Sequence, residues 1–187
     1  MPAVRVTAVV TAHDRRQYLA EAVRSALDSG ADEVVVVRNF AGPIDGCEGR
    51  YRDVPCEIPD TGEKEARGAD AATGEVVAFL DDDDVWEPTK VPALREAFGR
   101  DPDLVYFCHR QSAIDSQGRP VAASHRELTG KDPTRFRSAD HGDLRQLVET
   151  VWPGNNSSTA LRASTTSGRG AGWTSTTWAS DSWSAHG

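Results

Sequence analysis

Three short runs of mostly β-branched residues, separated by segments with helical periodicity, constrain the fold of this chain more than any other feature. The runs lie at Val4–Val10, Glu33–Val37 and Glu75–Leu80. Continuous apolar runs of this length are typical of strands that are buried on both faces of a sheet. Strands that alternate with helices predict an α/β fold, in which a mostly parallel sheet is flanked by helices.

The segments between these runs predict the helices. Asp14 is the expected N-cap of the first helix, and Gly30 ends that helix where glycine is favoured. A second helix is expected over 63–72 with Thr61 as its cap, and a third begins at Pro88. Further along, the sequence predicts a short strand near Val54–Ile58, a strand over Leu104–Cys108, a hairpin over Ser112–Ala122 and a helix over Asp143–Val151.

Length and charge exclude several classes of protein. The 187 residues suit one domain of ordinary size. The chain has 21 basic and 29 acidic residues, for a net charge of -8. This charge disfavours a nucleic-acid-binding function, because phosphate contacts need a basic surface. No apolar run approaches the roughly 20 residues of a transmembrane span, and no signal peptide is recognisable. The three cysteines are widely spaced and odd in number, which matches neither a disulfide framework nor a zinc site. We therefore expect a cytoplasmic protein, peripheral to a membrane at most.

Four consecutive aspartates, Asp81–Asp84, directly follow the third apolar run. Adjacent carboxylates repel one another, and a hard divalent cation such as Mg²⁺ or Mn²⁺ relieves that repulsion because it prefers carboxylate oxygen. The alternative interpretation is a solvated acidic turn that caps the helix after Pro88. Two other polar clusters, Thr11–Arg15 and Arg38–Asn39, also follow predicted strands. Since the carboxyl ends of parallel strands share one edge, we expect all three clusters to converge on one site.

Two stretches of the sequence resemble glycosyltransferase family 2. VTAVVTAHDRRQYLAEAVRSAL is similar to the opening of that family, and GEKEARGADAATGEVVAFLDDDDVWEPTKV is similar to its central block, which ends in an Asp-any-Asp motif. The resemblance covers about residues 4–110 and continues more weakly through 153–158. It implies a GT-A fold and the transfer of a sugar from a nucleotide-diphospho-sugar donor to a glycan, lipid or small-molecule acceptor. Such transfer usually proceeds with inversion and uses Mn²⁺ or Mg²⁺.

The resemblance also implies nucleotide-binding residues. Thr11, Ala12 and His13 lie where the first loop of the family touches the nucleotide, and Arg15 matches a basic residue beside that loop. Arg67 matches an arginine that faces the nucleotide. Each residue has an alternative interpretation: His13 closes a turn, Arg15 is a solvated helix residue, and Arg67 pairs with a glutamate one helical turn earlier.

The same resemblance assigns the acidic run. Asp81 and Asp83 match the two acidic positions of the metal motif, with Asp83 the more direct ligand. Asp84 is a neighbouring candidate ligand. Asp82, like Asp81, is a candidate contact to the nucleotide-sugar.

The sequence departs from the family in two places. After the second strand the family has a pair of aspartates, whereas this chain has Arg38 and Asn39. Asn39 is then the candidate contact to the base or ribose, and Arg38 a candidate contact to phosphate. The general base of an inverting transferase is expected in the C-terminal region, where Asp181 is the weak candidate. A non-catalytic nucleotide-sugar-binding module is therefore the alternative function. A sugar-phosphate nucleotidyltransferase is disfavoured because the first loop contains no glycine.

The composition changes after Arg162. Residues 163–187 include three tryptophans and many Ser, Thr, Gly and Ala residues, but no Leu, Ile, Val, Met or Phe. We expect residues 1–162 to form the GT-A domain and 163–187 to form an irregular tail. An alternative hypothesis is that the tail was translated in a shifted reading frame relative to a longer ancestral enzyme, so that the acceptor side is altered.

Overall fold

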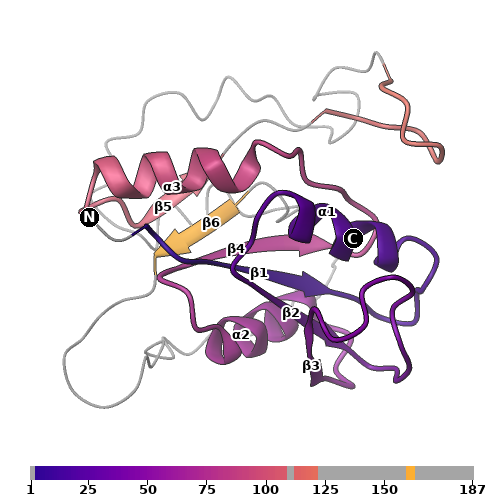
Figure 1. The fold of residues 1–187 in the computed structure, drawn as a ribbon. Coiled ribbons are helices and arrows are strands. Elements are labelled where there is room, and N and C mark those ends of the chain that lie inside the picture. Colours follow the sequence, from indigo (N-terminus) through magenta and orange to yellow (C-terminus); the bar gives the residue numbers. More distant parts are fainter. Residues whose placement is uncertain (1–2, 109–111, 122–158, 163–187) are drawn as a thin grey trace, which may run out of the picture.

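The computed structural model describes residues 3–108, 112–121 and 159–162, and within them it has the α/β architecture that the sequence predicts (Figure 1). Helices and strands alternate from the first strand to α3, except that β3 follows β2 directly. In chain order the elements are β1 (Val6–Thr11), α1 (Leu19–Asp28), β2 (Glu33–Arg38), β3 (Arg52–Pro55), α2 (Thr61–Ala71), β4 (Val76–Asp81), α3 (Lys90–Arg100), β5 (Tyr106–Cys108) and β6 (Thr159–Arg162).

The strands of the described residues form one six-stranded sheet in the order β3-β2-β1-β4-β6-β5. The pairs β1–β2, β1–β4 and β2–β3 are parallel, whereas β6 runs antiparallel to β4 and β5. The order reverses between β1 and β4, because β2 and β3 lie on one side of β1 and β4 lies on the other. In open α/β sheets, ligands bind at such a topological switch point, beyond the carboxyl ends of the strands. We call this end of β1, β2 and β4 the carboxyl edge and the opposite end the amino edge.

Helices cover both faces of the sheet (Figure 1). Helices α1 and α3 lie on one face and α2 lies on the other. Alternate side chains of a strand point to opposite faces, so in β1 Val6, Ala8 and Val10 join the apolar cluster beneath α1 and α3, whereas Val9 faces α2. All four side chains are fully buried. Coverage of both faces explains why the strand sequences are continuously apolar instead of alternating with polar residues.

Gly68 determines how closely α2 approaches the sheet. A Cβ atom on Gly68 would lie 2.2 Å from Cγ1 of Val9 and 3.1 Å from Cγ2 of Val37, so any larger residue would push the helix away from β1 and β2. Because α2 begins after β3 ends, this close contact also fixes the first turns of the helix near the carboxyl edge. Lys64 and Arg67 belong to those turns.

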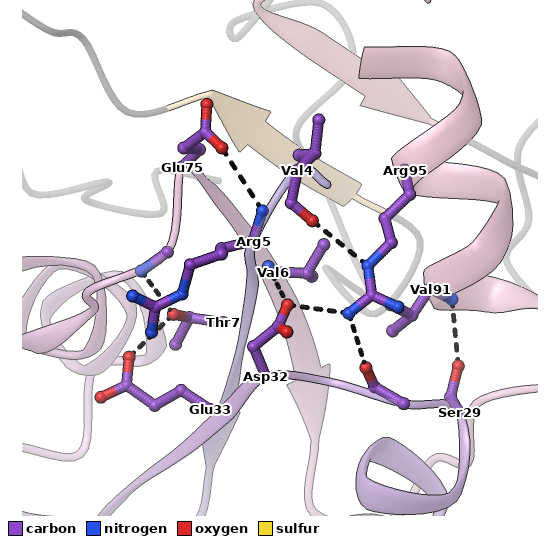
Figure 2. Close-up of polar contacts among 12 residues, drawn as sticks. Val4, Arg5, Val6, Thr7, Ser29, Asp32, Glu33, Glu75, Val91 and Arg95 are labelled. Atoms are coloured by element: carbon purple, nitrogen blue, oxygen red, sulfur yellow. Dashed lines mark hydrogen bonds and ion pairs between the residues drawn. The ribbon is translucent and has the colours of Figure 1, made fainter. Parts of the chain in front are cut away.

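At the amino edge, Asp32 joins β1, β2 and α3 (Figure 2). Its Oδ2 atom accepts a hydrogen bond from the backbone N–H of Val6 at 2.8 Å and pairs with Nη2 of Arg95 at 2.8 Å. The Arg95 guanidinium also donates to the carbonyl oxygens of Gly30 and Val4. These contacts tie together segments of the chain that lie far apart in sequence.

The carboxylate of Glu33, the next residue, also has hydrogen-bond donors from several segments. Its carboxylate accepts hydrogen bonds from Oγ1 of Thr7 at 2.8 Å and from the backbone N–H of Thr73 at 2.8 Å, and it pairs with Arg52 at 2.9 Å. Burial alone would raise the pKa of Glu33, and likewise that of Asp32. Their donors outweigh burial, so the pKa of each carboxyl lies below its ordinary value.

The first helix starts later than the sequence predicts. Asp14 is not its N-cap, because α1 begins at Leu19 and Asp14 has a left-handed φ of 59°. The carboxylate of Asp14 instead accepts a hydrogen bond from the side chain of Asn39 at 2.7 Å. This contact between two loops takes the place of the predicted cap. The expected end of the helix is confirmed, because Gly30 follows the C-cap with a φ of 90°.

The starts of the other two helices also differ from prediction. The N-cap of α2 is Asp60, whose side chain accepts a backbone hydrogen bond from the first turn, and Thr61 is the first helical residue. Helix α3 begins at Lys90, two residues after Pro88. Trp86 packs into the core just before this point, which holds the preceding segment in a non-helical conformation.

Most of the other predicted elements fall on described residues. The short strand predicted near Val54–Ile58 is β3, displaced toward the N-terminus, and the hairpin is present as a bridge between Ile114 and Pro120. The predicted helix over 143–151 and the tail over 163–187 lie outside the described residues.

Candidate functional site

Segments that are far apart in the sequence meet at the carboxyl edge. Thr11 and Asp81 are paired in register at the ends of β1 and β4, and Oγ1 of Thr11 donates to Oδ1 of Asp81 at 3.3 Å. The backbone N–H of Ala12 donates to the carbonyl oxygen of Val37 in β2. The polar cluster after β1 is thus in direct contact with the ends of both neighbouring strands.

Asp81 lies in the least favourable position for a charged carboxylate. Burial, together with the negative charges of Asp84 and Asp83, raises its pKa to about 6, and the hydrogen bond from Thr11 compensates only in part. A carboxyl group with this pKa is partly protonated just below neutral pH. The end of β4 therefore carries more negative charge than its surroundings stabilise.

Arg15 bridges the next two aspartates. Its guanidinium nitrogens lie 2.5 Å from Oδ1 of Asp82 and 2.7 Å from Oδ2 of Asp83. The Asp82 side chain is only 4% exposed, whereas 62% of the Arg15 side chain is exposed. Arg15 thus acts as a counter-ion for the acidic run. Because its side chain is largely exposed, it can move away from these carboxylates.

One oxygen of the acidic run has no hydrogen-bond donor. Oδ2 of Asp82 is buried and unpaired among the described residues. Burial raises the pKa of Asp82, although the contact with Arg15 opposes this effect. Within residues 3–108, 112–121 and 159–162, no group of three or more His, Cys, Asp or Glu side chains is arranged to hold a metal ion. In this conformation Arg15 lies between the carboxylates of Asp82 and Asp83.

The loop after β1 is tied to the loop after β2 by a reciprocal pair of hydrogen bonds. The backbone N–H of Asp14 donates to Oδ1 of Asn39 at 3.0 Å, and Nδ2 of Asn39 donates to Oδ1 of Asp14 at 2.7 Å. Asn39 therefore lies at the predicted edge, but both ends of its amide already have a protein partner. A contact with a base or ribose remains a prediction.

Arg38 is structural. It is 3% exposed, and it donates to both carboxylate oxygens of Asp53 at 2.7 Å and to the carbonyl oxygen of Gly42 at 2.6 Å. Its guanidinium also lies over the rings of Phe40 and Tyr51. These contacts close the segment between β2 and β3 and hold the Arg38 guanidinium in the interior. Sequence reasoning missed Asp53, whose only signal is its place in β3, the strand that pairs with β2.

His13 and Arg67 have contacts that the sequence leaves open. Nδ1 of His13 lies 3.3 Å from Nζ of Lys64, a residue that sequence reasoning missed. Arg67 pairs with Glu63 at 2.8 Å, and both side chains are 42% exposed. This is the alternative interpretation of Arg67, and its contact with a nucleotide remains a prediction. The signal for Lys64 was the scarcity of large apolar residues in α2, which leaves charged side chains on its buried face.

The remaining predictions concern the C-terminal region and membranes. Asp181, the weak candidate for the general base, lies outside the described residues. Among the described residues, no helix is long and apolar enough to cross a membrane.

Comparisons with known proteins find similarity to glycosyltransferases. A model of glycosyl transferase family 2 matches residues 66–157. An uncharacterized glycosyltransferase of Nostoc sp. (strain PCC 7120) is 28% identical over 129 residues, and the match covers 63% of this chain and 40% of that protein. The chain thus spans less than half of the length of this relative.

Solved structures share the fold. S. aureus TarS 1-349 in complex with UDP-GlcNAc is 16% identical, with a TM-score of 0.52 over 63% of this chain and 37% of that chain. The same protein in complex with UDP gives 16% identity and a TM-score of 0.51, covering 63% of this chain and 38% of that chain. This likeness identifies the sheet and its helices as a fold of the GT-A type.

Proposed function

We propose that this chain acts as a metal-dependent glycosyltransferase, because a model of glycosyl transferase family 2 matches residues 66–157 and a glycosyltransferase is among its relatives. The reaction moves a sugar from a nucleotide-diphospho-sugar to an acceptor hydroxyl, with inversion at the anomeric carbon. The observation that carries this proposal is the location of Asp81–Asp84 beyond the end of β4, beside the switch point between β1 and β4. This is where open α/β sheets bind their ligands.

The acidic run fits a hard divalent cation, Mn²⁺ or Mg²⁺. Burial and the neighbouring negative charges raise the pKa of Asp81, and a buried oxygen of Asp82 has no donor. A cation bound here would stabilise both carboxylates. Such sites often use only one or two protein carboxylates and leave the other positions to substrate phosphates, so a preformed set of three ligands is not required. We assign Asp81, Asp83 and Asp84 as ligands, with Asp83 the most direct. A cation held there would neutralise charge on the leaving diphosphate.

Other side chains at the carboxyl edge would orient the donor. Arg15 is exposed enough to move from Asp83 to a phosphate of the donor, which would also free the carboxylate. Thr11, Ala12 and His13 line the loop between β1 and α1. They would contact the nucleotide together with Asn39, Arg67, Asp81 and Asp82.

The partners of a glycosyltransferase are a sugar donor and an acceptor. TarS, which has the same type of fold, is known in complex with UDP-GlcNAc and with UDP. We therefore propose a nucleotide-diphospho-sugar donor and a glycan, lipid or small-molecule acceptor. The acidic net charge of the chain, -8, argues against nucleic acid as acceptor.

Calorimetry with UDP and GDP, in Mn²⁺ and in EDTA, tests the metal and the site together. We expect the wild-type chain to bind one nucleotide at least about tenfold more tightly in Mn²⁺. Asp83→Asn should bind equally weakly under both conditions. Asp103→Asn, an exposed acidic residue between α3 and β5, is the matched control and should behave as wild type. Equal affinity of the wild-type chain in Mn²⁺ and EDTA would contradict the proposal.

The composition of residues 163–187 favours one second candidate, a binding module without a working general base. Donor hydrolysis or transfer separates the two. A glycosyltransferase releases nucleoside diphosphate from the donor that it binds, whereas a binding module retains the donor intact.

A further inference from the structure

Lys64 buries an ammonium group next to the loop that follows β1. The residue is 2% exposed, although lysine is rarely buried this completely without a partner. In the described part of the chain its ammonium contacts no carboxylate. It donates instead to the carbonyl oxygen of Ile58 and lies 3.3 Å from Nδ1 of His13. A buried cation has thus been placed against an imidazole and a carbonyl group.

This contact determines the tautomer of His13. A lysine ammonium has three donors and no acceptor, so Nδ1 of His13 must accept the hydrogen bond. A neutral imidazole whose Nδ1 accepts carries its hydrogen on Nε2. Nε2 lies 3.7 Å from Oδ2 of Asp14, which is too long for a hydrogen bond, and the side chain of His13 is 31% exposed. The Nε2–H group therefore remains able to donate to a ligand.

The position of His13 indicates what that ligand is. The residue follows Thr11 and Ala12, which contact the ends of β4 and β2, and it precedes Asp14, which is tied to the loop after β2. We propose that Lys64 is a positioning residue. It holds His13 as the Nε2–H tautomer, so that His13 donates a hydrogen bond to an oxygen of the bound nucleotide. This inference rests on the proposed function for the identity of the ligand but not for the tautomer.

Nitrogen-15 NMR of the histidine rings at pH 8 tests the tautomer without any nucleotide. The chain has five histidines, and His13→Gln identifies the resonances of His13 by their loss. We expect the wild-type chain to show Nε2–H at His13, and Lys64→Met to shift it toward a mixture of tautomers. Lys90→Met is the matched control, because Lys90 is also buried but lies beside Trp86, and it should leave His13 unchanged.

Calorimetry with the full chain and Mn²⁺ tests the ligand. Lys64→Met and His13→Gln should each weaken binding of UDP or GDP about tenfold, the effect of losing one hydrogen bond, and the double variant should be no weaker than either one. The oxygen that His13 contacts belongs to either the base or a phosphate. Calorimetry with uridine or guanosine, and separately with inorganic pyrophosphate, distinguishes the two. If His13 meets the base, the variants weaken binding of the nucleoside; if it meets phosphate, they weaken binding of pyrophosphate.

Several results would overturn the proposal. Nδ1–H at His13 in the wild-type chain would do so, and this measurement needs no variant to fold. An unchanged tautomer in Lys64→Met, or additive effects of the two variants on affinity, would also do so. If the wild-type chain binds no nucleotide, the proposed function and the ligand assignment fail together, and the NMR result still decides the link between Lys64 and His13.

Discussion

The two edges of the sheet place the same kind of side chain in opposite electrostatic settings. At the amino edge, Asp32 and Glu33 are surrounded by donors that keep their pKa values low (Figure 2). At the carboxyl edge, burial and like charges raise the pKa of Asp81 to about 6, and an oxygen of Asp82 lacks a donor. The donors of the first edge stabilise its carboxylates, whereas the second edge, where we propose that a ligand binds, leaves its carboxylates only partly stabilised.

The largest expected effect is on the amino edge. Asp32→Ala removes the acceptor of the Val6 N–H and the partner of Arg95, so the free energy of unfolding should fall by about 2 kcal/mol. Urea denaturation measures this change. Glu96→Ala is the control, because Glu96 pairs with Arg100 on the exposed surface of α3, and its loss should change stability little. Equal effects of the two substitutions would show that the contacts of Asp32 with Val6 and Arg95 contribute no more than the exposed ion pair on α3.

Asp81→Asn should raise the free energy of unfolding, whereas Asp32→Ala lowers it. The pKa of Asp81 is raised from 3.8 to about 6 in the folded chain, so between these values the folded chain binds more protons than the unfolded chain, and stability falls as pH rises. The substitution removes this penalty. In EDTA it should raise the free energy of unfolding by about 2 kcal/mol at pH 7 and by little below pH 4. Urea denaturation across this pH range is the measurement, and a loss of stability at pH 7 would contradict the comparison.

Glu33→Gln should cost less than Asp32→Ala, about 1 kcal/mol at pH 7, because glutamine keeps the shape and one acceptor. The pKa of Glu33 is lowered in the folded chain, so its contribution is present above its unfolded pKa and is lost as pH falls through the folded value. The stabilities of wild type and Glu33→Gln should therefore converge in acid. Parallel curves down to pH 2 would show that the charge of Glu33 contributes nothing.

The sequence predicts the framework of this molecule far better than its contacts. The strands are predictable because burial on both faces requires continuous apolar runs, and the location of Asp81–Asp84 follows from parallel pairing. Contacts between loops are not local in sequence. Asp14 resembles a helix cap, yet its partner is Asn39, 25 residues away. Arg38 is a residue type that often binds phosphate, yet its guanidinium donates to Asp53 and lies over the ring of Phe40.

Substitution of Arg15 has the smallest expected effect. It is also the most direct test of how positive and negative charges are balanced at the carboxyl edge. Its guanidinium bridges Asp82 and Asp83 and therefore competes with any cation for these carboxylates. Arg15→Gln removes one positive charge within a few ångströms of the site, so the affinity for Mn²⁺ alone should rise by about three- to tenfold at low ionic strength. The gain should shrink in high salt, because most of the Arg15 side chain is exposed and screening reduces its interaction.

Electron paramagnetic resonance of free Mn²⁺, without nucleotide, measures this affinity. Arg119→Gln is the control, because Arg119 pairs with Asp115 within the hairpin and not with the acidic run. If Arg15→Gln binds Mn²⁺ no better than Arg119→Gln, Arg15 does not stand in for a cation, and the excess negative charge at this edge has another role.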